Sequence, residues 1–315
     1  MINFFDRCYS SIKDQNRLLS KLRYYSGLRF IIRLAANMTL PIYFRIKQNK
    51  KHNCLKTCTK IEGRIIVSLT SFPARINRLW LVVETLLRQT QLPDKIILWL
   101  SEEQFPSLET LPKNLLRLQK NGLEIRLCQG DLRSHKKYYY ALQEFPGDVI
   151  ITVDDDVFYN LRLIEYLVEL YKEFPDCVSC NRCSEINVLN KQIQPYISWK
   201  DYLLAKCPDY KIFSIGMGGV LYPPNIFYSS VLDSEIFMKY CDLADDIWLN
   251  VMSRLAEAKV VKSAYNSYYL PVMNYRNFTL SSINVNDGLN DKQLASVRSY
   301  CIENLGIDPF QQITA

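Results

Sequence analysis

Short apolar runs alternate with helical patterns in the first half of the chain. Residues 64–69, 95–100, 123–128 and 148–153 are rich in Ile, Val and Leu, the composition of strands buried in a parallel sheet. Residues 76–88 instead repeat apolar positions at helical spacing, and residues 135–145 are predicted as a second helix. This alternation predicts a doubly wound α/β sheet.

The second half is less regular. Its pattern predicts a helix after Asn160, which can act as its N-cap, and a short strand at residues 177–180. Residues 212–222 form an extended segment interrupted by glycines, and residues 245–256 are predicted as a helix. No internal repeat or flexible linker separates these elements, so we expect one catalytic domain with appendages.

Residues 28–46 are the most apolar stretch, but Arg29, Arg33, Pro41 and Arg45 interrupt it. A membrane-spanning helix needs about 20 mostly apolar residues, so a span is not expected. On a helical template one face is apolar and the other polar, the pattern of an interfacial helix. The apolar face would hold Leu28, Ile31, Ile32, Ala35 and Ala36, and the polar face Arg29, Arg33 and Asn37. A helix packed on the catalytic body would show the same pattern.

Charge is distributed unevenly along the chain. Residues 1–60 carry 13 Lys and Arg against two acidic residues, whereas the rest carries 26 against 30. This basic leader predicts peripheral contact with an anionic membrane through residues 1–60, with a solvated helical face as the alternative. The first 15 residues lack a signal-peptide core, and the ten cysteines are irregularly spaced. Both features favour a cytoplasmic protein with reduced thiols.

Three consecutive aspartates, Asp154, Asp155 and Asp156, follow the fourth predicted strand. Ligands of open α/β sheets bind beyond the carboxyl ends of the strands. Adjacent carboxylates repel one another unless a cation neutralises them, and Mg²⁺ or Mn²⁺ prefers such oxygen ligands. In an extended segment Asp154 and Asp156 point to one side and Asp155 to the other.

The sequence TVDDDVFY, together with the order of the other motifs, resembles bacterial glycosyltransferases of the GT-A fold, of the family 2 type, which build capsular or lipopolysaccharide chains. The resemblance covers about residues 64–290. It implies a mixed, mostly parallel sheet flanked by helices, with a nucleotide-binding half at about residues 61–157 and an acceptor half at about 158–290. Residues 1–60 would form a basic, mainly helical extension and 291–315 a tail.

The resemblance also implies roles for individual residues. Asp154 and Asp156 would hold Mn²⁺ or Mg²⁺ on the donor diphosphate, and Asp155 would face the nucleoside. The remaining donor contacts would be Thr70, Ser71 and Arg75 in SLTSFPAR, Lys136 and Lys137 in SHKKYYY, and Gly218 and Gly219 in SIGMGGV.

Asp245 and Asp246, in DLADDIW, stand where relatives place the base that deprotonates the acceptor hydroxyl. Asp245 resembles that base somewhat more closely than Asp246 does, but the sequence does not separate the two. The only histidines are His52 and His135, so the C-terminal metal-binding histidine of many retaining relatives is missing, which favours inversion. Asn284, Asn286 and Asp287 could supply oxygen ligands instead.

The predicted activity is therefore transfer of a sugar, of the hexosyltransferase type, from a nucleotide-diphosphate sugar to a glycan or lipid-linked glycan hydroxyl, at the inner face of the cell membrane. Nucleic acid is not an expected partner. Two alternatives stay open: a metal-dependent nucleotidyltransferase, which also uses paired carboxylates, and a non-catalytic relative that binds glycan or nucleotide.

Overall fold

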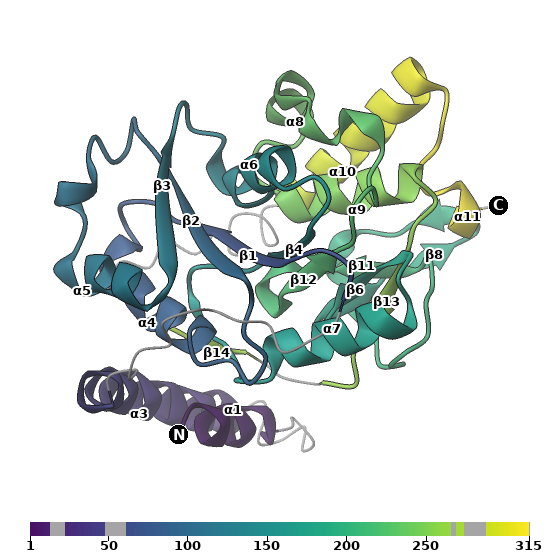
Figure 1. Ribbon diagram of the computed structural model, residues 1–315. Coiled ribbons are helices and arrows are strands. Elements are labelled where there is room, and N and C mark those ends of the chain that lie inside the picture. The colour runs from purple at the N-terminus through teal and green to yellow at the C-terminus, as the bar shows by residue number, and fades with distance from the viewer. Residues whose placement is uncertain (13–22, 48–60, 266–268, 274–287, 315) are drawn as a thin grey trace.

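A seven-stranded sheet forms the centre of the protein. The computed structural model describes residues 1–12, 23–47, 61–265, 269–273 and 288–314 (Figure 1). The strand order is β13-β6-β12-β4-β1-β2-β3. β12 runs antiparallel to both its neighbours, and the other adjacent pairs are parallel. The strands are β1 (Ile65–Thr70), β2 (Lys95–Ser101), β3 (Leu123–Cys128), β4 (Val149–Thr152), β6 (Cys177–Cys180), β12 (Val220–Tyr222) and β13 (Lys259–Lys262).

Helices cover both faces of this sheet, because alternate strand residues point to opposite sides. In β1, Ile65, Val67 and Leu69 share one apolar core with α4 (Ile76–Leu86) and α7 (Leu163–Glu173). Ile66 belongs to a second core with α6 (Lys136–Glu144). A third core fills the second half, beneath α8 (Ser234–Tyr240), α9 (Asp245–Leu255) and α10 (Leu289–Tyr300). The mixed, mostly parallel sheet flanked by helices confirms the predicted fold class.

Smaller elements complete the chain. In a three-stranded sheet, β7 (Cys183–Glu185) lies between β10 (Lys200–Asp201) and β11 (Ile212–Ser214). Two further pairs are β14 (Leu270–Pro271) with β5 (Val157–Phe158) and β8 (Val188–Leu189) with β9 (Gln192–Ile193). The short helices are α5 (Lys113–Leu116), α11 (Gln311–Thr314) and a π-helical turn, η8 (Cys301–Leu305), after α10. The 3-10 turns are η1 (Leu108–Thr110), η2 (Arg117–Asn121), η3 (Arg133–His135), η4 (Tyr196–Ser198), η5 (Gly216–Gly218) and η6 (Ser229–Leu232).

The predicted elements of the first half agree with the structure to within two residues. The extended segment 212–222 is β11 and β12 joined by η5. The capping prediction for Asn160 is wrong, since α7 begins after Arg162 and has no side-chain cap. Asn160 instead accepts a hydrogen bond from the Arg162 amide at 2.9 Å and donates one to Asp6 at 2.7 Å. Its side chain therefore links the start of α7 to the N-terminal segment.

Two N-terminal helices, α1 (Ile2–Ser10) and α3 (Tyr24–Ile46), lie side by side against the sheet's helical layer (Figure 1). Buried Asp6 of α1 accepts hydrogen bonds from Asn160 and from the Tyr265 hydroxyl, each at 2.7 Å. Phe44 of α3 packs edge-on against Trp80 of α4, with ring centroids 6.4 Å apart. Among the described residues, no helix is long and apolar enough to cross a membrane.

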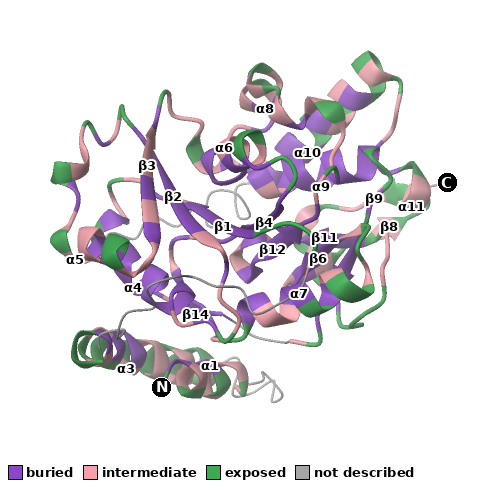
Figure 2. Cartoon of the chain, in the orientation of Figure 1, coloured by how far each residue is buried: buried purple, intermediate pink, exposed green. Residues whose placement is uncertain are grey.

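The predicted division of α3 into faces is wrong. The side that packs on the body holds Ala36, Asn37, Leu40 and Phe44, whereas Ile31 is 61% exposed. Asn37, predicted on the polar face, donates to the carbonyl of Pro271 at 3.0 Å and accepts from the Met273 amide at 2.8 Å. In Figure 2 the ribbon of α3 accordingly alternates between buried and exposed residues. Helical periodicity gives the spacing of faces but does not say which face the body will cover.

Candidate functional site

A cavity of about 570 Å³ opens at the carboxyl ends of β1 and β4. β1 and β4 are neighbours at the centre of the sheet. β2 and β3 lie on the far side of β1, whereas β4 lies on its other side, so the strand order reverses here, and such a switch point is where α/β sheets bind ligands. We call one side of the cavity the β4 end; it is lined by Thr70, Ser71, Phe72, Arg75, Asp131, Arg133, Ser134, Lys136, Lys137, Asp154, Asp155 and Asp156. We call the side lined by Arg182, Ser184, Tyr196, Phe213, Ile215 and Asn290 the β6 end. Asp245 and Asp246, at the start of α9, also line the cavity.

The acidic triplet is held by basic and hydroxyl groups at the β4 end. Asp155 accepts hydrogen bonds from the Ser71 hydroxyl and from Arg75, each at 2.6 Å. Arg75 also pairs with Asp156 at 3.0 Å. Asp155 is buried and faces the loop after β1, while Asp154 turns toward α6. Arg75 therefore ties the second and third carboxylates to the loop in which the sequence predicts a nucleotide contact.

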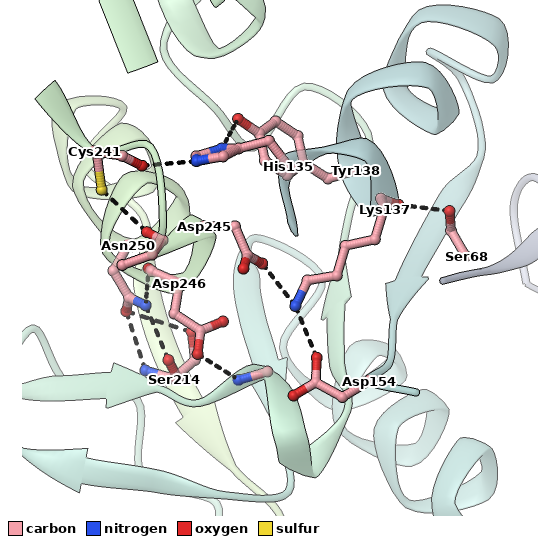
Figure 3. Close-up of polar contacts among 12 residues, drawn as sticks. Ser68, His135, Lys137, Tyr138, Asp154, Ser214, Cys241, Asp245, Asp246 and Asn250 are labelled. Atoms are coloured by element: carbon pink, nitrogen blue, oxygen red, sulfur yellow. Dashed lines mark hydrogen bonds and ion pairs between the residues drawn. The ribbon is translucent and has the colours of Figure 1, made fainter. Parts of the chain in front are cut away.

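Lys137 links the triplet to α9 (Figure 3). Its buried ammonium lies 2.8 Å from Asp154 and 2.7 Å from Asp245. The backbone carbonyl of Lys137 accepts a 2.5 Å hydrogen bond from Ser68 of β1. That bond fixes the first turn of α6 against the sheet. One lysine thus joins carboxylates that are about 90 residues apart in sequence.

The start of α9 is fixed by a polar network around Asn250 (Figure 3). Asn250 donates to the carbonyl of Ser214 at 3.0 Å and to that of Asp246 at 2.8 Å. The Asp246 carboxylate accepts the Gly216 amide at 3.0 Å. Both aspartates lie in the first turn of α9, where the helix dipole stabilises negative charge.

Burial changes the proton affinity of this site. It raises the pKa of Asp246 to about 7, an effect that Asp245 strengthens and Lys137 opposes. It also raises the pKa of Asp156 to about 7 against the opposing charge of Arg75. For Lys137 burial lowers the pKa, but Asp154, Asp245 and Asp246 outweigh it and hold the pKa well above its ordinary value. Two carboxyls of the cavity, those of Asp156 and Asp246, therefore have pKa values near neutral pH.

The other basic residues before and in α6 are engaged with partners. Lys136 pairs with Asp131, and Arg133 with Asp242. His135 is buried, stacks on Phe237 at 4.3 Å and bonds to the hydroxyl of Tyr138 at 2.8 Å (Figure 3). Burial lowers its pKa to about 4. His135 is thus a neutral part of the core, which orients α6.

Glycines 216, 218 and 219 allow close packing beside the cavity. A Cβ on Gly216 would lie 2.6 Å from Asp246, and one on Gly218 would lie 2.5 Å from the Cβ of Arg182. Gly219 has a φ of 76°, in the left-handed region that favours glycine. Gly218 and Gly219 are not among the residues that line the cavity. Their contacts are with Arg182, Tyr269 and Leu163.

The structure brings most of the sequence-predicted site residues to one cavity: Thr70, Ser71, Arg75, Lys136, Lys137, Asp154, Asp155, Asp156, Asp245 and Asp246. His52, Asn284, Asn286 and Asp287 lie outside the described residues. Sequence reasoning missed Arg182 and Tyr196. The strand at 177–180 was predictable, and the rule that ligands bind beyond strand ends would have marked Arg182. No local signal marks Tyr196.

The donor chemistry of the site suits a hard divalent cation, since the carboxylates offer only oxygen. Among the described residues, no group of three or more His, Cys, Asp or Glu side chains could hold a metal. Nucleotide-dependent Mg²⁺ sites commonly use one or two carboxylates and complete the shell with phosphate and water. Asp154 and Asp156 fit that smaller donor set. Because Lys137 contacts Asp154 and Arg75 contacts Asp156, the cation would bind these carboxylates alongside the two basic groups.

Comparison with known proteins gives a fold relationship. No family model matches the chain, and no curated protein matches its sequence. The mannosyltransferase PcManGT from Pyrobaculum calidifontis, solved with GDP-Man and Mn2+, is 12% identical with a TM-score of 0.50, over 90% of this chain and 78% of that one. CMP:2-keto-3-deoxy-manno-octonic acid synthetase, solved with CTP, is 9% identical with a TM-score of 0.42, over 76% of this chain and 100% of that one. The likeness to the mannosyltransferase places the chain in the GT-A type of α/β fold.

Proposed function

We propose that this protein is a glycosyltransferase that moves a sugar from a nucleotide-diphosphate sugar to a glycan or lipid-linked glycan hydroxyl. The observation that carries the proposal is Lys137, whose ammonium bridges Asp154 of the triplet and Asp245 of α9 within one cavity. The acidic triplet, proposed for the donor, and the acidic pair of α9, proposed for the acceptor, are thus both in contact with the Lys137 ammonium. Transfer between two substrates needs this proximity.

The β4 end is the proposed donor site. Thr70, Ser71, Arg75 and Asp155 would bind the nucleoside and adjacent phosphate, because they surround the loop after β1. Lys136 and Lys137 supply positive charge for the diphosphate. Asp154 and Asp156 would hold Mn²⁺ or Mg²⁺, which supplies charge neutralisation of the diphosphate leaving group when bound.

Asp246 is the proposed base. A general base works best with a pKa near the operating pH, and burial raises the pKa of Asp246 to about 7. Asp245 instead keeps its carboxylate on Lys137 at 2.7 Å. Asp246 would take the proton of the acceptor hydroxyl as that oxygen attacks the sugar from the face opposite the diphosphate, which gives inversion.

The experiment is a donor screen with Mn²⁺. GDP-mannose, UDP-glucose and other nucleotide sugars are incubated with the protein, and released nucleoside diphosphate and anomeric configuration of the product are measured. Turnover of at least one nucleotide sugar, lost without divalent metal, is the expected result. No turnover of any sugar nucleotide, with pyrophosphate release from a nucleoside triphosphate and a sugar phosphate, would identify a nucleotidyltransferase.

We further propose that α3 docks the enzyme on an anionic membrane. Phe30, Leu34, Met38, Ile42 and Ile46 recur every four residues and are 40–77% exposed. They form an apolar line about 24 Å long, at 1.5 Å per residue, that winds around the helix by about 40° at each four-residue step. α3 contains Arg29, Arg33 and Arg45 but no acidic residue. An apolar line bordered by basic residues suits the interface of an anionic bilayer.

Vesicle sedimentation tests this docking. The protein should sediment with phosphatidylglycerol vesicles but little with phosphatidylcholine vesicles, and the M38E/I42E variant should lose at least tenfold in binding. Leu204→Glu is the matched control, because Leu204 is 61% exposed at a distant position. A concentration-dependent dimer abolished by M38E/I42E, without vesicle binding, would assign this face to a second copy of the chain and overturn the membrane proposal.

A further inference from the structure

Five basic side chains line the cavity, and four of them are paired with carboxylates. Arg75 pairs with Asp155 and Asp156, Arg133 with Asp242, Lys136 with Asp131, and Lys137 with Asp154 and Asp245. Arg182 is the fifth. Within the part of the chain that the structure describes, its guanidinium makes no hydrogen bond or ion pair. Among the described residues, Arg182 is therefore the cavity-lining cation that has no carboxylate partner.

The fold holds the root of Arg182 in place. Its carbonyl accepts a hydrogen bond from the Ile215 amide at 3.0 Å. Its Cβ occupies the space that a side chain at position 218 would need, since a Cβ there would approach to 2.5 Å. The guanidinium lies 5.9 Å from the ring centroid of Tyr269. Arg182 is thus a positioned side chain with an unused charge.

Neutral groups line the β6 end of the cavity together with Arg182, and Asp246 and Asp291 are the acidic groups whose charges also reach Tyr196 at this end. Ser184, Tyr196 and Asn290 contribute hydroxyl and amide groups, and Phe213 and Ile215 contribute apolar surface. Burial and the charge of Asp246 raise the pKa of Tyr196, and the charge of Arg182 opposes that rise. Asp291 is engaged with the amide of Tyr196 at 2.7 Å. A ligand at this end therefore meets one free cation with hydrogen-bonding and apolar groups around it.

The turn η5 relates Arg182 to the proposed base. A Cβ on Gly216 would lie 2.6 Å from Asp246, and a Cβ on Gly218 would lie 2.5 Å from the Cβ of Arg182. Consecutive Cα atoms are about 3.8 Å apart, and each Cβ lies about 1.5 Å from its Cα, so the Cβ of Arg182 lies within roughly 16 Å of the Asp246 carboxylate. A charge bound by Arg182 would belong to the substrate whose hydroxyl Asp246 contacts.

We propose that the acceptor carries a phosphate or carboxylate close to the reacting hydroxyl, and that Arg182 binds this anionic group. The inference rests on the proposed function, because it requires an acceptor at the β6 end. The planar guanidinium matches both anions with two parallel hydrogen bonds. An oxyanion would pair the cavity-lining cation that has no carboxylate partner among the described residues, without displacing an existing ion pair.

The test compares neutral and anionic acceptors in pairs. Glucose, glucose 6-phosphate and glucuronate, with the corresponding mannose derivatives, are titrated into the protein by calorimetry, and the KM of each is measured in transfer with the best donor. The wild type should prefer an anionic member at least tenfold. A phosphate preference and a carboxylate preference distinguish the two sources of charge.

Variants assign that preference to Arg182. Arg182→Gln should reduce it to less than twofold and raise the acceptor KM more than it lowers kcat, whereas Arg182→Lys should retain part of it. Arg162→Gln, which removes a surface arginine paired with Glu165, should keep the full preference. Equal binding of neutral and anionic sugars by the wild type, or an unchanged preference in Arg182→Gln, overturns the proposal. Anion-selective binding with no transfer from any nucleotide sugar would reject the proposed function and leave the anion site standing.

Discussion

The two ends of the cavity differ in how they handle charge. At the β4 end each described cation is paired with a carboxylate, and Arg75 and Lys137 each contact two. At the β6 end Arg182 has no carboxylate partner among the described residues. A closed set of ion pairs holds residues together in the absence of ligand, whereas an unpaired cation gains a partner only when ligand binds. The β4 end is therefore built for a defined geometry, and the β6 end for recognition.

The largest expected effect falls at the boundary between the two ends. Asp246→Asn should lower sugar transfer by about 10²–10⁴-fold, the usual contribution of a general base. Initial rates at saturating donor measure the loss. Asp201→Asn, at an exposed position in β10, should retain the wild-type rate. A transfer rate above one tenth of wild type in Asp246→Asn would move the base to Asp245.

Next in size is the effect of Lys137 on stability. Lys137→Met leaves Asp154 and Asp245 without their shared cation, and removing one partner of a buried pair costs about 3 kcal/mol or more. Urea denaturation should therefore show a lower free energy of unfolding. Lys113→Met, at an exposed position, should change little. A Lys137→Met protein as stable as wild type would mean that the ion pairs of the β4 end contribute nothing net.

A smaller effect concerns pH. In the unfolded chain the carboxyl of Asp156 ionises near pH 4, but burial raises its folded pKa to about 7. The unfolded state thus releases its proton first as pH rises from 4 to 7, and the free energy of unfolding falls over that window and stays lower above it. Asp156→Asn removes this contribution.

Urea denaturation at pH 4, 6 and 8 measures it. The variant should gain stability relative to wild type at pH 8, by about 1 kcal/mol or more, given 1.36 kcal/mol per pKa unit, and should gain none at pH 4. An equal difference at all three pH values would instead indicate a change in packing.

The smallest expected effect concerns Arg182, at the β6 end of the cavity. Arg182→Gln should leave the free energy of unfolding within about 0.5 kcal/mol of wild type, because the guanidinium has no ion pair in the described structure to lose. The same urea titration measures it. A loss of more than about 1 kcal/mol would show that Arg182 supports the fold, and the contrast between the two ends would disappear.

The local sequence pattern was enough to predict the sheet of the first half and the location of both acidic groups. Those features depend on neighbouring residues: an apolar run forms a buried strand, and in a parallel sheet the residues after each strand meet at one edge. The triplet Asp154–Asp156 and the pair at the start of α9 could be found in this way.

The pairing of the acidic triplet with the start of α9, in contrast, follows from the tertiary structure. The bridge from Asp154 through Lys137 to Asp245 joins three elements whose spacing in sequence carries no distance information. Contacts with the rest of the protein, such as those of Asn37 with Pro271 and Met273, set which face of α3 is covered. The unpaired state of Arg182 likewise depends on which carboxylates the fold brings near it, because a charge is free or neutralised only by its neighbours in space.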